Sequence, residues 1–284
     1  MQFACRTYTY KKDMDFKDVE KPKERGQLRK YLGKEYFIFK RKLHWWKNSS
    51  KYAAILDAEK QPYSLIKHRS LLLRPLKDVD MYLQYNKITN LRLAIDKING
   101  VVIRPGQVFS IWRLVGRPSK SKGYLEGLAL HNGKISTDIG GGLCQLGNLL
   151  YWISLHSDLD ITQRWRHSFD VFPDINRKIP FACGATLSYN YIDLELTNNT
   201  ENTYQINLWL DNDYLNGELL CDQKPNCKFE VFETDHMIKQ QWWGGYTRHN
   251  KIWKRKTDLN DNSVTEIMVT ENHAIMMYNP LLSE

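Results

Sequence analysis

The spacing of apolar residues predicts helices in the first half of the chain. Residues 90–98 place apolar side chains on one face at helical spacing, and Asn99 and Gly100 end this helix. Residues 143–155 contain so many apolar side chains that the helix they predict is buried on nearly all sides. Residues 22–51 predict one or two further helices. The chain is therefore expected to begin with mainly helical segments.

From residue 161 onward the apolar pattern changes to a period of two, which is typical of strands. In residues 185–196 this alternation directs Leu194 and Leu196 inward and Asp193 to the opposite face. The full set of predicted strands covers residues 101–116 around a Pro105-Gly106 turn, 160–169, 185–196, 203–210, 217–222 and 227–233, and the regions of Trp253 and of residues 265–269. The predicted class is α+β, with the apolar helix of residues 143–155 packed on an antiparallel sheet, a helical N-terminal region and a strand-rich C-terminal half.

The length and composition indicate a globular protein of one or two domains. The chain has 284 residues, of which 42% are hydrophobic and 12% aromatic, enough to form a large core. We divide it into a helical N-terminal region, residues 1–100, packed on a main domain, residues 101–284, which ends in a strand-rich part, residues 199–284. No stretch reaches the roughly 20 apolar residues that span a bilayer. Because charges interrupt the first segment where a signal peptide needs its apolar core, we expect a cytoplasmic protein.

The cysteines predict reduced thiols rather than a disulfide framework. They are odd in number and scattered along the chain, at Cys5, Cys144, Cys183, Cys221 and Cys227. Cys221 and Cys227 are close enough in sequence to pair or to share a metal, but no second pair and no nearby histidine completes a zinc pattern. We therefore expect no metal site, and the sequence implies no cofactor.

The net charge of +9 is concentrated near the N-terminus. Residues 20–52 contain eleven Lys or Arg against three acids, interleaved with aromatic residues. A basic face beside an aromatic one is typical of helices that lie on an anionic membrane surface, here the inner face of the membrane. The simpler interpretation is a solvated helix whose aromatic side packs on the main domain. Nucleic acid is the least favoured partner, because the chain has no recognisable recognition module.

The motif GGGLCQ at residues 140–145 places one thiol at the predicted start of the apolar helix. The unpaired N–H groups of a first helical turn favour a thiolate, and a thiolate is the nucleophilic form of cysteine. Three glycines allow a tight turn and the close approach of a substrate or of another backbone. We assign the candidate nucleophile to Cys144 and a ligand-binding turn to Gly140, Gly141, Gly142 and Gln145. The alternative is that the glycines only permit close packing around a small buried side chain.

A cysteine on a helix is followed in the chain by a histidine and an acid on predicted strands. Cys144, His167 and Asp193 occur in this order, which resembles the core of transglutaminase-like and papain-like enzymes. In such a site the thiolate attacks, the histidine moves the proton and the acid orients the imidazole. Asp170 and Asp174 are equally available as the third residue. Each of these side chains also has a purely structural interpretation, as a hydrogen-bonded histidine or a strand carboxylate.

Several strings together resemble one family. The chain is similar to the VanW family of accessory proteins, which are encoded with some vancomycin-resistance clusters of the B type. The similarity is carried by the strings PGQVFSIWRLVG, GYLEG, GGGLCQLGNLLYW, RWRHSF and FPD, and it is clearest over residues 105–198. It implies an association with glycopeptide resistance or with the cell envelope, and no defined reaction. Many members carry an acid before an Ala-Thr pair, where this chain has Gly184.

These observations support three hypotheses. The first is an acyl-transfer or amide-hydrolysing enzyme that uses Cys144 and His167 on a cell-wall peptide or precursor. The second is a non-enzymatic accessory or binding module at the inner membrane surface. In the third, the GGGLCQ motif is only structural, and replacing Cys144 costs stability without a specific loss of function. The sequence assigns neither the substrate nor the oligomeric state.

Overall fold

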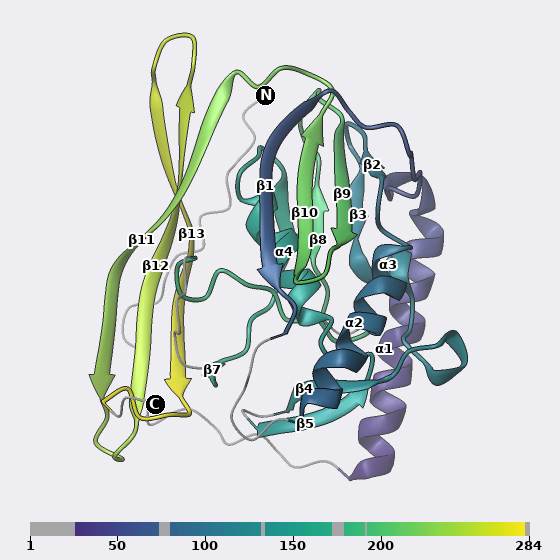
Figure 1. Ribbon diagram of the computed structural model, residues 1–284, viewed down its shortest axis with the longest axis vertical. Coiled ribbons are helices and arrows are strands. Elements are labelled where there is room, and N and C mark those ends of the chain that lie inside the picture. Colours follow the sequence, from purple (N-terminus) through teal and green to yellow (C-terminus); the bar gives the residue numbers. More distant parts are fainter. Residues whose placement is uncertain (1–25, 74–79, 132–133, 172–178, 191, 282–284) are drawn as a thin grey trace.

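The computed structural model describes residues 26–73, 80–131, 134–171, 179–190 and 192–281. The helices within them are α1 (Gln27–Lys47), α2 (Met81–Ile95), α3 (Ile111–Val115) and α4 (Cys144–Ser154), with 3-10 turns at Ser49–Lys51 and Lys120–Lys122. The strands are β1 (Tyr63–Leu71), β2 (Val101–Ile103), β3 (Val108–Ser110), β4 (Glu126–His131), β5 (Lys134–Ile139), β6 (Asp160–Gln163), β7 (Phe169–Asp170), β8 (Glu195–Thr197), β9 (Tyr204–Leu210), β10 (Tyr214–Cys221), β11 (Cys227–Gln240), β12 (Tyr246–Asp258) and β13 (Val264–Met276). This order, shown in Figure 1, confirms the predicted α+β class with its helical start and strand-rich C-terminal half.

The cysteine-bearing helix α4 packs on a four-stranded antiparallel sheet with the order β1-β10-β9-β2. Its side chains Leu146, Leu150 and Ile153 are fully buried, and each such side chain contributes about 1.5–3 kcal/mol to folding. Leu149 lies so close to β10 that a Cβ on Gly217 would come within 2.8 Å of its side chain. The predicted packing of the apolar helix on an antiparallel sheet is therefore confirmed.

The structure differs from the strand predictions before α4. Residues 111–115 form the short helix α3 instead of a strand, because Ser110 caps it by accepting a hydrogen bond from the N–H of Arg113 at 3.2 Å. The sequence pattern predicts neither the hairpin β4–β5 nor β1, which pairs with β10. Because β1 lies before residue 100 and β10 lies after it, the N-terminal region and the main domain share one sheet.

Two further differences follow α4. Residues 164–168 connect β6 to β7 and are not part of a strand, so His167 lies outside a strand. Within residues 185–196 the alternating pattern gives only an isolated bridge between Ser188 and Ile192 and the start of β8. Leu194 and Leu196 are buried as predicted, whereas Asp193, expected on the opposite face, is also buried.

The longest strands form a second sheet along one side of the molecule (Figure 1). β11, β12 and β13 pair antiparallel, and the short strand β7 pairs parallel with β13. Two side chains of β12 attach this sheet to the loop after α4. Lys254 donates a hydrogen bond to the carbonyl oxygen of Ser157 at 2.8 Å, and Lys256 forms an ion pair with Asp158 at 2.7 Å.

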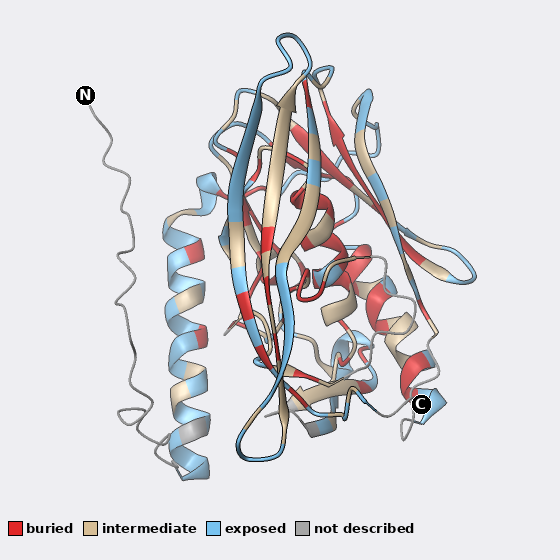
Figure 2. Ribbon diagram, turned by 90° about the vertical axis from the view of Figure 1, so that its left-hand side faces the viewer, coloured by how far each residue is buried: buried red, intermediate tan, exposed pale blue. Residues whose placement is uncertain are grey.

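Helix α1 runs along the side of the central body, as Figures 1 and 2 show. It begins at Gln27, so residues 20–25 of the basic segment lie outside the described part of the chain. Cys5 and Asp174 lie outside it as well. Among the described helices, none combines the length and the apolar composition that crossing a membrane requires.

Candidate functional site

Cys144 is the first residue of α4, as the sequence predicts. The glycine turn leads directly into the helix, because the N–H of Gln145 donates to the carbonyl of Gly142 at 3.1 Å and that of Leu146 to Leu143 at 3.0 Å. The thiol therefore lies at the positive end of the helix. This is the position in which a cysteine becomes a nucleophile when the surrounding groups also favour the thiolate.

The immediate surroundings of the Cys144 sulfur oppose the thiolate. Its hydrogen-bond partner is the backbone of Leu187, whose N–H donates to the sulfur at 3.4 Å and whose carbonyl oxygen lies 3.9 Å from it. Burial raises the pKa of the Cys144 thiol, although the N–H groups of Leu187 and Cys144 act in the other direction. The space beside Gly147, one turn after Cys144, is filled, because a Cβ on Gly147 would come within 3.0 Å of the Ala185 carbonyl and of Leu187. The net effect is opposite to the activation that the helix terminus alone predicts.

Alkylation of Cys144 by iodoacetamide is expected to be slow at neutral pH. Because burial raises its pKa, the midpoint of the rate against pH should lie above that of the same cysteine in the denatured chain. Labelling across a pH series, followed by peptide mass spectrometry, separates Cys144 from the other cysteines. A native Cys144 that reacts faster than its denatured reference would instead identify an activated thiol.

The three glycines of the turn are packed against other parts of the chain. A Cβ on Gly140 would come within 2.6 Å of Pro118, and one on Gly141 would overlap the backbone of Gly127 in β4. Gly142 has a φ of +90° and faces the side chain of Lys87 from α2. These packing contacts explain why glycine stands at all three positions. The ligand-binding role of the glycines stays a prediction.

Side-chain amides fix the turn and the strand beside it. Asn90 of α2 donates to the carbonyl of Gly141 at 2.9 Å and accepts from the N–H of Leu125 at 2.8 Å. Gln145, a predicted ligand-binding residue, donates to the hydroxyl of Ser70 at 2.9 Å and to the carbonyl of Leu71 at 2.8 Å. Gln145 therefore holds the end of β1 against the start of α4.

The structure places Asp193 in a different hydrogen-bond network from Cys144. Its carboxylate accepts hydrogen bonds from the hydroxyl of Ser110 at 2.6 Å and from the N–H groups of Trp112 at 3.3 Å and Leu194 at 2.8 Å. Burial raises its pKa to about 7, and the neighbouring Glu195 carboxylate adds to this. Asp193 thus supports the start of α3.

His167 lies in the segment between β6 and β7, next to side chains that pack on residues 181–186. Arg166 stacks over the ring of Phe181 at 4.4 Å, and the N–H of Thr186 donates to the carbonyl of Trp165 at 2.8 Å. The alternative acid Asp170 accepts a hydrogen bond from the hydroxyl of Tyr278 at 3.0 Å. The catalytic roles of His167 and Asp193 stay predictions.

The glycine at the position of the expected acid is explained by its neighbour on α4. Asn148, one turn after Cys144, accepts a hydrogen bond from the N–H of Ala185 at 2.9 Å. Its side-chain oxygen occupies the space that a Cβ on Gly184 would need. An acidic side chain at position 184 therefore requires a smaller or displaced residue at position 148.

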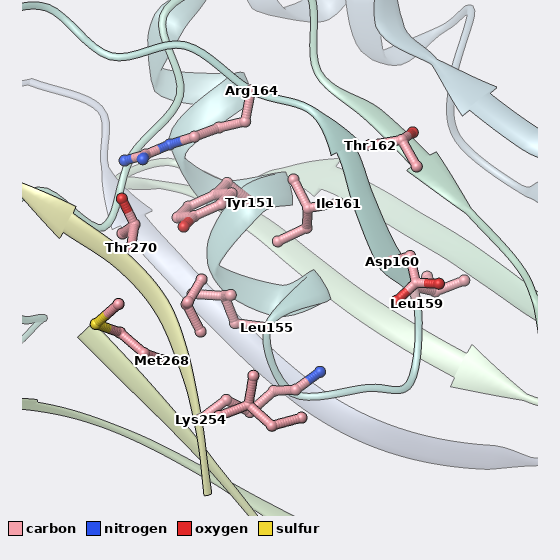
Figure 3. A pocket seen from close by; sticks show the side chains of 12 residues that line it. Tyr151, Leu155, Leu159, Asp160, Ile161, Thr162, Arg164, Lys254, Met268 and Thr270 are labelled. Atoms are coloured by element: carbon pink, nitrogen blue, oxygen red, sulfur yellow. The ribbon is translucent and has the colours of Figure 1, made fainter. Parts of the chain in front are cut away.

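A cavity beside α4 is a feature that the sequence pattern does not indicate. It has a volume of about 530 Å³ and lies where the end of α4 and β6 face β13 (Figure 3). Its apolar lining comes from Leu155, Leu159, Ile161, Ile267, Met268 and Val269, and its polar lining from Tyr151, Asp160, Thr162, Arg164, Lys254 and Thr270. It forms only when two sheets far apart in sequence come together, so no local motif predicts it.

A cation lies at each end of this cavity. Arg164 donates two hydrogen bonds to the carbonyls of Gly184 at 2.9 Å and Ala182 at 2.6 Å, and it stacks over Tyr151 at 4.6 Å. Figure 3 shows the guanidinium of Arg164 and the hydroxyl of Tyr151 at the same end of the cavity. At the other end, burial lowers the pKa of the Lys254 ammonium, whereas the carboxylates of Asp158 and Asp160 raise it. The cavity therefore combines an apolar floor with two positive groups.

A β-bulge in β13 shapes the cavity wall. Ile252 of β12 pairs with Thr270 and the next residue, Trp253, pairs with Met268, so Val269 has no partner in β12. A bulge bends its strand and increases the local twist. The bulged segment, with Met268, Val269 and Thr270, lines the cavity.

Among the described residues, no three His, Cys, Asp or Glu side chains lie close enough together to hold a metal ion. The four cysteines of the described part, Cys144, Cys183, Cys221 and Cys227, are free thiols.

The chain is similar to known proteins over most of its length. A family described as VanW like protein matches residues 86–220. The Vancomycin B-type resistance protein VanW of Enterococcus faecalis is 33% identical over 230 residues, which make up 81% of this chain and 83% of that protein. The Uncharacterized protein YoaR of Bacillus subtilis is 29% identical over 109 residues, 38% of this chain and 34% of that protein. No solved structure matches the chain.

Proposed function

The chain belongs to the VanW-like protein family, and on that premise we propose that it is an accessory protein of vancomycin resistance that binds a cell-wall peptide or precursor. The name of its relative from Enterococcus faecalis supports the link to resistance. The observation that carries the binding proposal is the cavity of about 530 Å³ between α4 and β13. Sites for small ligands typically have volumes of about 300–1,000 Å³.

The chemistry of the cavity suits a peptide with a free carboxylate. One terminal nitrogen of Arg164 has no hydrogen-bond partner among the described residues, and Lys254 uses a single hydrogen bond to Ser157. Both cations therefore retain donors for a carboxylate, and such charge-assisted hydrogen bonds are the strong ones. Ile161, Met268 and Val269 provide an apolar surface for small side chains such as alanine. Cell-wall peptides combine these two features.

Of the two walls of the cavity, one lies within the residues that the family matches and the other lies beyond them. Tyr151 and Arg164 lie within residues 86–220, the part that the family matches, whereas Lys254 and Met268 lie beyond it. We propose that the first wall supplies recognition common to the family. The wall on β12 and β13 then adjusts the site to one ligand.

Titration of the full chain with the soluble UDP-linked peptide precursor of peptidoglycan tests the proposal by calorimetry. Lys254→Met is expected to weaken binding about tenfold or more, because it removes a charged donor. Met268→Trp is expected to abolish binding by filling the cavity. Lys251→Met is the matched control, because Lys251 lies on the same strand but pairs with Asp235 at 2.8 Å outside the cavity.

Thermal melting of each variant separates lost binding from lost folding. If the parent chain does not bind the precursor, or if Lys251→Met and Lys254→Met weaken binding equally, the cavity is not its binding site.

A second candidate is Cys-His-dependent acyl transfer or amide hydrolysis on the same class of ligand. It is favoured by the position of Cys144 at the first residue of α4, with the Leu187 N–H directed at its sulfur. In this case His167 is the base and Cys144→Ser abolishes the resistance phenotype, whereas a binding protein tolerates this change. A transglutaminase-like arrangement of Cys144, His167 and Asp193 is part of this second candidate and not of the binding proposal. For either activity we propose a cytoplasmic location, which the free thiols support.

A further inference from the structure

Helix α1 presents a continuous apolar stripe to solvent. The stripe, named here the α1 stripe, consists of Leu28, Leu32, Tyr36, Phe39, Leu43 and Trp46. These side chains are all exposed, Phe39 by 65% and Trp46 by 75%. At 100° per residue they fall within about a quarter of the helix circumference. Figure 2 shows α1 exposed along most of its length, with two short buried patches.

The opposite side of α1 holds it on the body of the protein. Ile38 and Trp45 are its buried side chains. Arg41 donates to Glu195 at 3.0 Å and to Gln163 at 2.8 Å. Glu35, at the border of the α1 stripe, forms an ion pair with Arg117 at 3.0 Å. These contacts fix the rotation of the helix, so that the α1 stripe points outward. The interpretation in which the aromatic side packs on the main domain is wrong for most aromatic residues of α1. Trp45 is buried, whereas Tyr31, Tyr36, Phe37, Phe39 and Trp46 are exposed.

Basic residues flank the α1 stripe on both sides. By helical geometry Arg29, Lys40 and Lys47 lie along one border, and Lys42 lies along the other. All four are exposed and form no ion pair with any described residue. The one acid of the helix, Glu35, is neutralised by Arg117. The surface is therefore apolar along its centre and positive at its edges.

We propose that α1 docks the protein on an anionic lipid surface. An amphipathic helix with Leu, Phe and Trp on one face and lysines beside them lies in the interface plane, with its apolar face among the acyl chains and its lysines at the phosphate groups. With 21 residues, α1 provides a contact about 31 Å long. The charge at the edges favours an anionic bilayer over a second copy of this basic chain, which has a net charge of +9 and repels itself.

Cosedimentation of the full chain with vesicles tests this docking. Vesicles of phosphatidylcholine are compared with vesicles of phosphatidylcholine and phosphatidylglycerol in equal parts. The parent chain is expected to sediment with the anionic vesicles and to remain in solution with the neutral ones. The double variant Phe39→Gln with Trp46→Gln should bind at least about tenfold more weakly, because two apolar side chains no longer enter the acyl region.

A charge variant and two controls complete the design. Replacing Lys40, Lys42 and Lys47 with Gln should weaken binding on the order of a hundredfold at low salt. The control for charge replaces Lys224, Lys228 and Lys239, which are also exposed but lie outside α1, and it should bind like the parent. The control for an exposed aromatic is Trp242→Gln, at the 96% exposed tip between β11 and β12.

Three results would overturn the proposal. The first is equal binding to neutral and anionic vesicles. The second is a loss of binding in the two control variants that matches the loss in the α1 variants. The third is a parent chain that ignores vesicles but dimerises by analytical ultracentrifugation, with the dimer lost on Phe39→Gln and Trp46→Gln, because the α1 stripe would then join two copies of the chain.

Discussion

Replacing Gly141 with alanine is expected to destabilise the protein by about 3 kcal/mol or more, the upper range for forcing extra volume into a packed site. A Cβ at this position would overlap the carbonyl oxygen of Gly127. Backbone cannot move aside as a flexible side chain does. To admit the methyl group, the turn before α4 must separate from β4, which also breaks the hydrogen bond from Asn90 to the Gly141 carbonyl. The change therefore disrupts the position of Cys144 as well as the turn.

Chemical denaturation measures this effect, and Gly33→Ala provides the matched control. Gly33 lies inside α1, and a Cβ added there would have no neighbouring atom within 4 Å. Alanine is favoured over glycine in a helix interior, so the control should gain about 0.5–1 kcal/mol. The midpoint should fall for Gly141→Ala and rise slightly for Gly33→Ala. If Gly141→Ala lowers the midpoint by no more than Gly33→Ala raises it, the close contact between Gly127 and Gly141 is not present in solution.

The elements that can be predicted from the sequence are those whose periodicity is strong within one segment. The helix that begins at Cys144 is apolar on nearly all sides, and β9, with the sequence YQINLWL, alternates between apolar and polar residues over most of its length. In both cases burial and local preference point to the same structure. The sequence does not predict β1, because the apolar and polar residues of YSLIKHRSL do not alternate. Its place is set by pairing with β10 far along the chain.

The candidate site can be predicted only in part, because its electrostatics depend on contacts between distant residues. The sequence locates Cys144 at a helix terminus, and it indicates nothing of the Leu187 backbone that covers the sulfur. Likewise Arg164 and Lys254 line one cavity only after the second sheet docks. The alternating pattern assigns Asp193 to an exposed strand face, but a local bridge ends before this residue and its side chain is buried.

Asp193→Asn is expected to make the protein more stable at pH 7 and to leave its stability nearly unchanged at pH 4. The native pKa of Asp193 is raised from 3.8 to about 7, mainly by burial and also by Glu195. A raised native pKa means that the folded state binds the proton more tightly than the unfolded chain does. The stabilisation is complete below pH 3.8 and is lost as the pH rises toward 7.

The gain at pH 7 has an upper limit of about 4 kcal/mol, since each pKa unit corresponds to ~1.4 kcal/mol. The neutral amide keeps an oxygen for the N–H groups of Trp112 and Leu194, so the start of α3 stays supported. Denaturant unfolding of parent and variant across this pH range isolates Asp193, because Glu195 is present in both. A difference in stability that does not change with pH would show that the carboxyl group is not buried.

Asp211→Asn is the control of opposite sign. Hydrogen bonds from Asn216, Asp213 and Tyr214 lower the pKa of the exposed Asp211. Its contribution is therefore present at neutral pH and is lost as the pH falls, so this variant should be the less stable one at pH 7. The Asp193→Asn variant also distinguishes the proposed binding function from the Cys-His-dependent reaction. If Asp193 orients a catalytic imidazole, resistance is lost while stability rises. If it only supports α3, both the phenotype and ligand binding are retained.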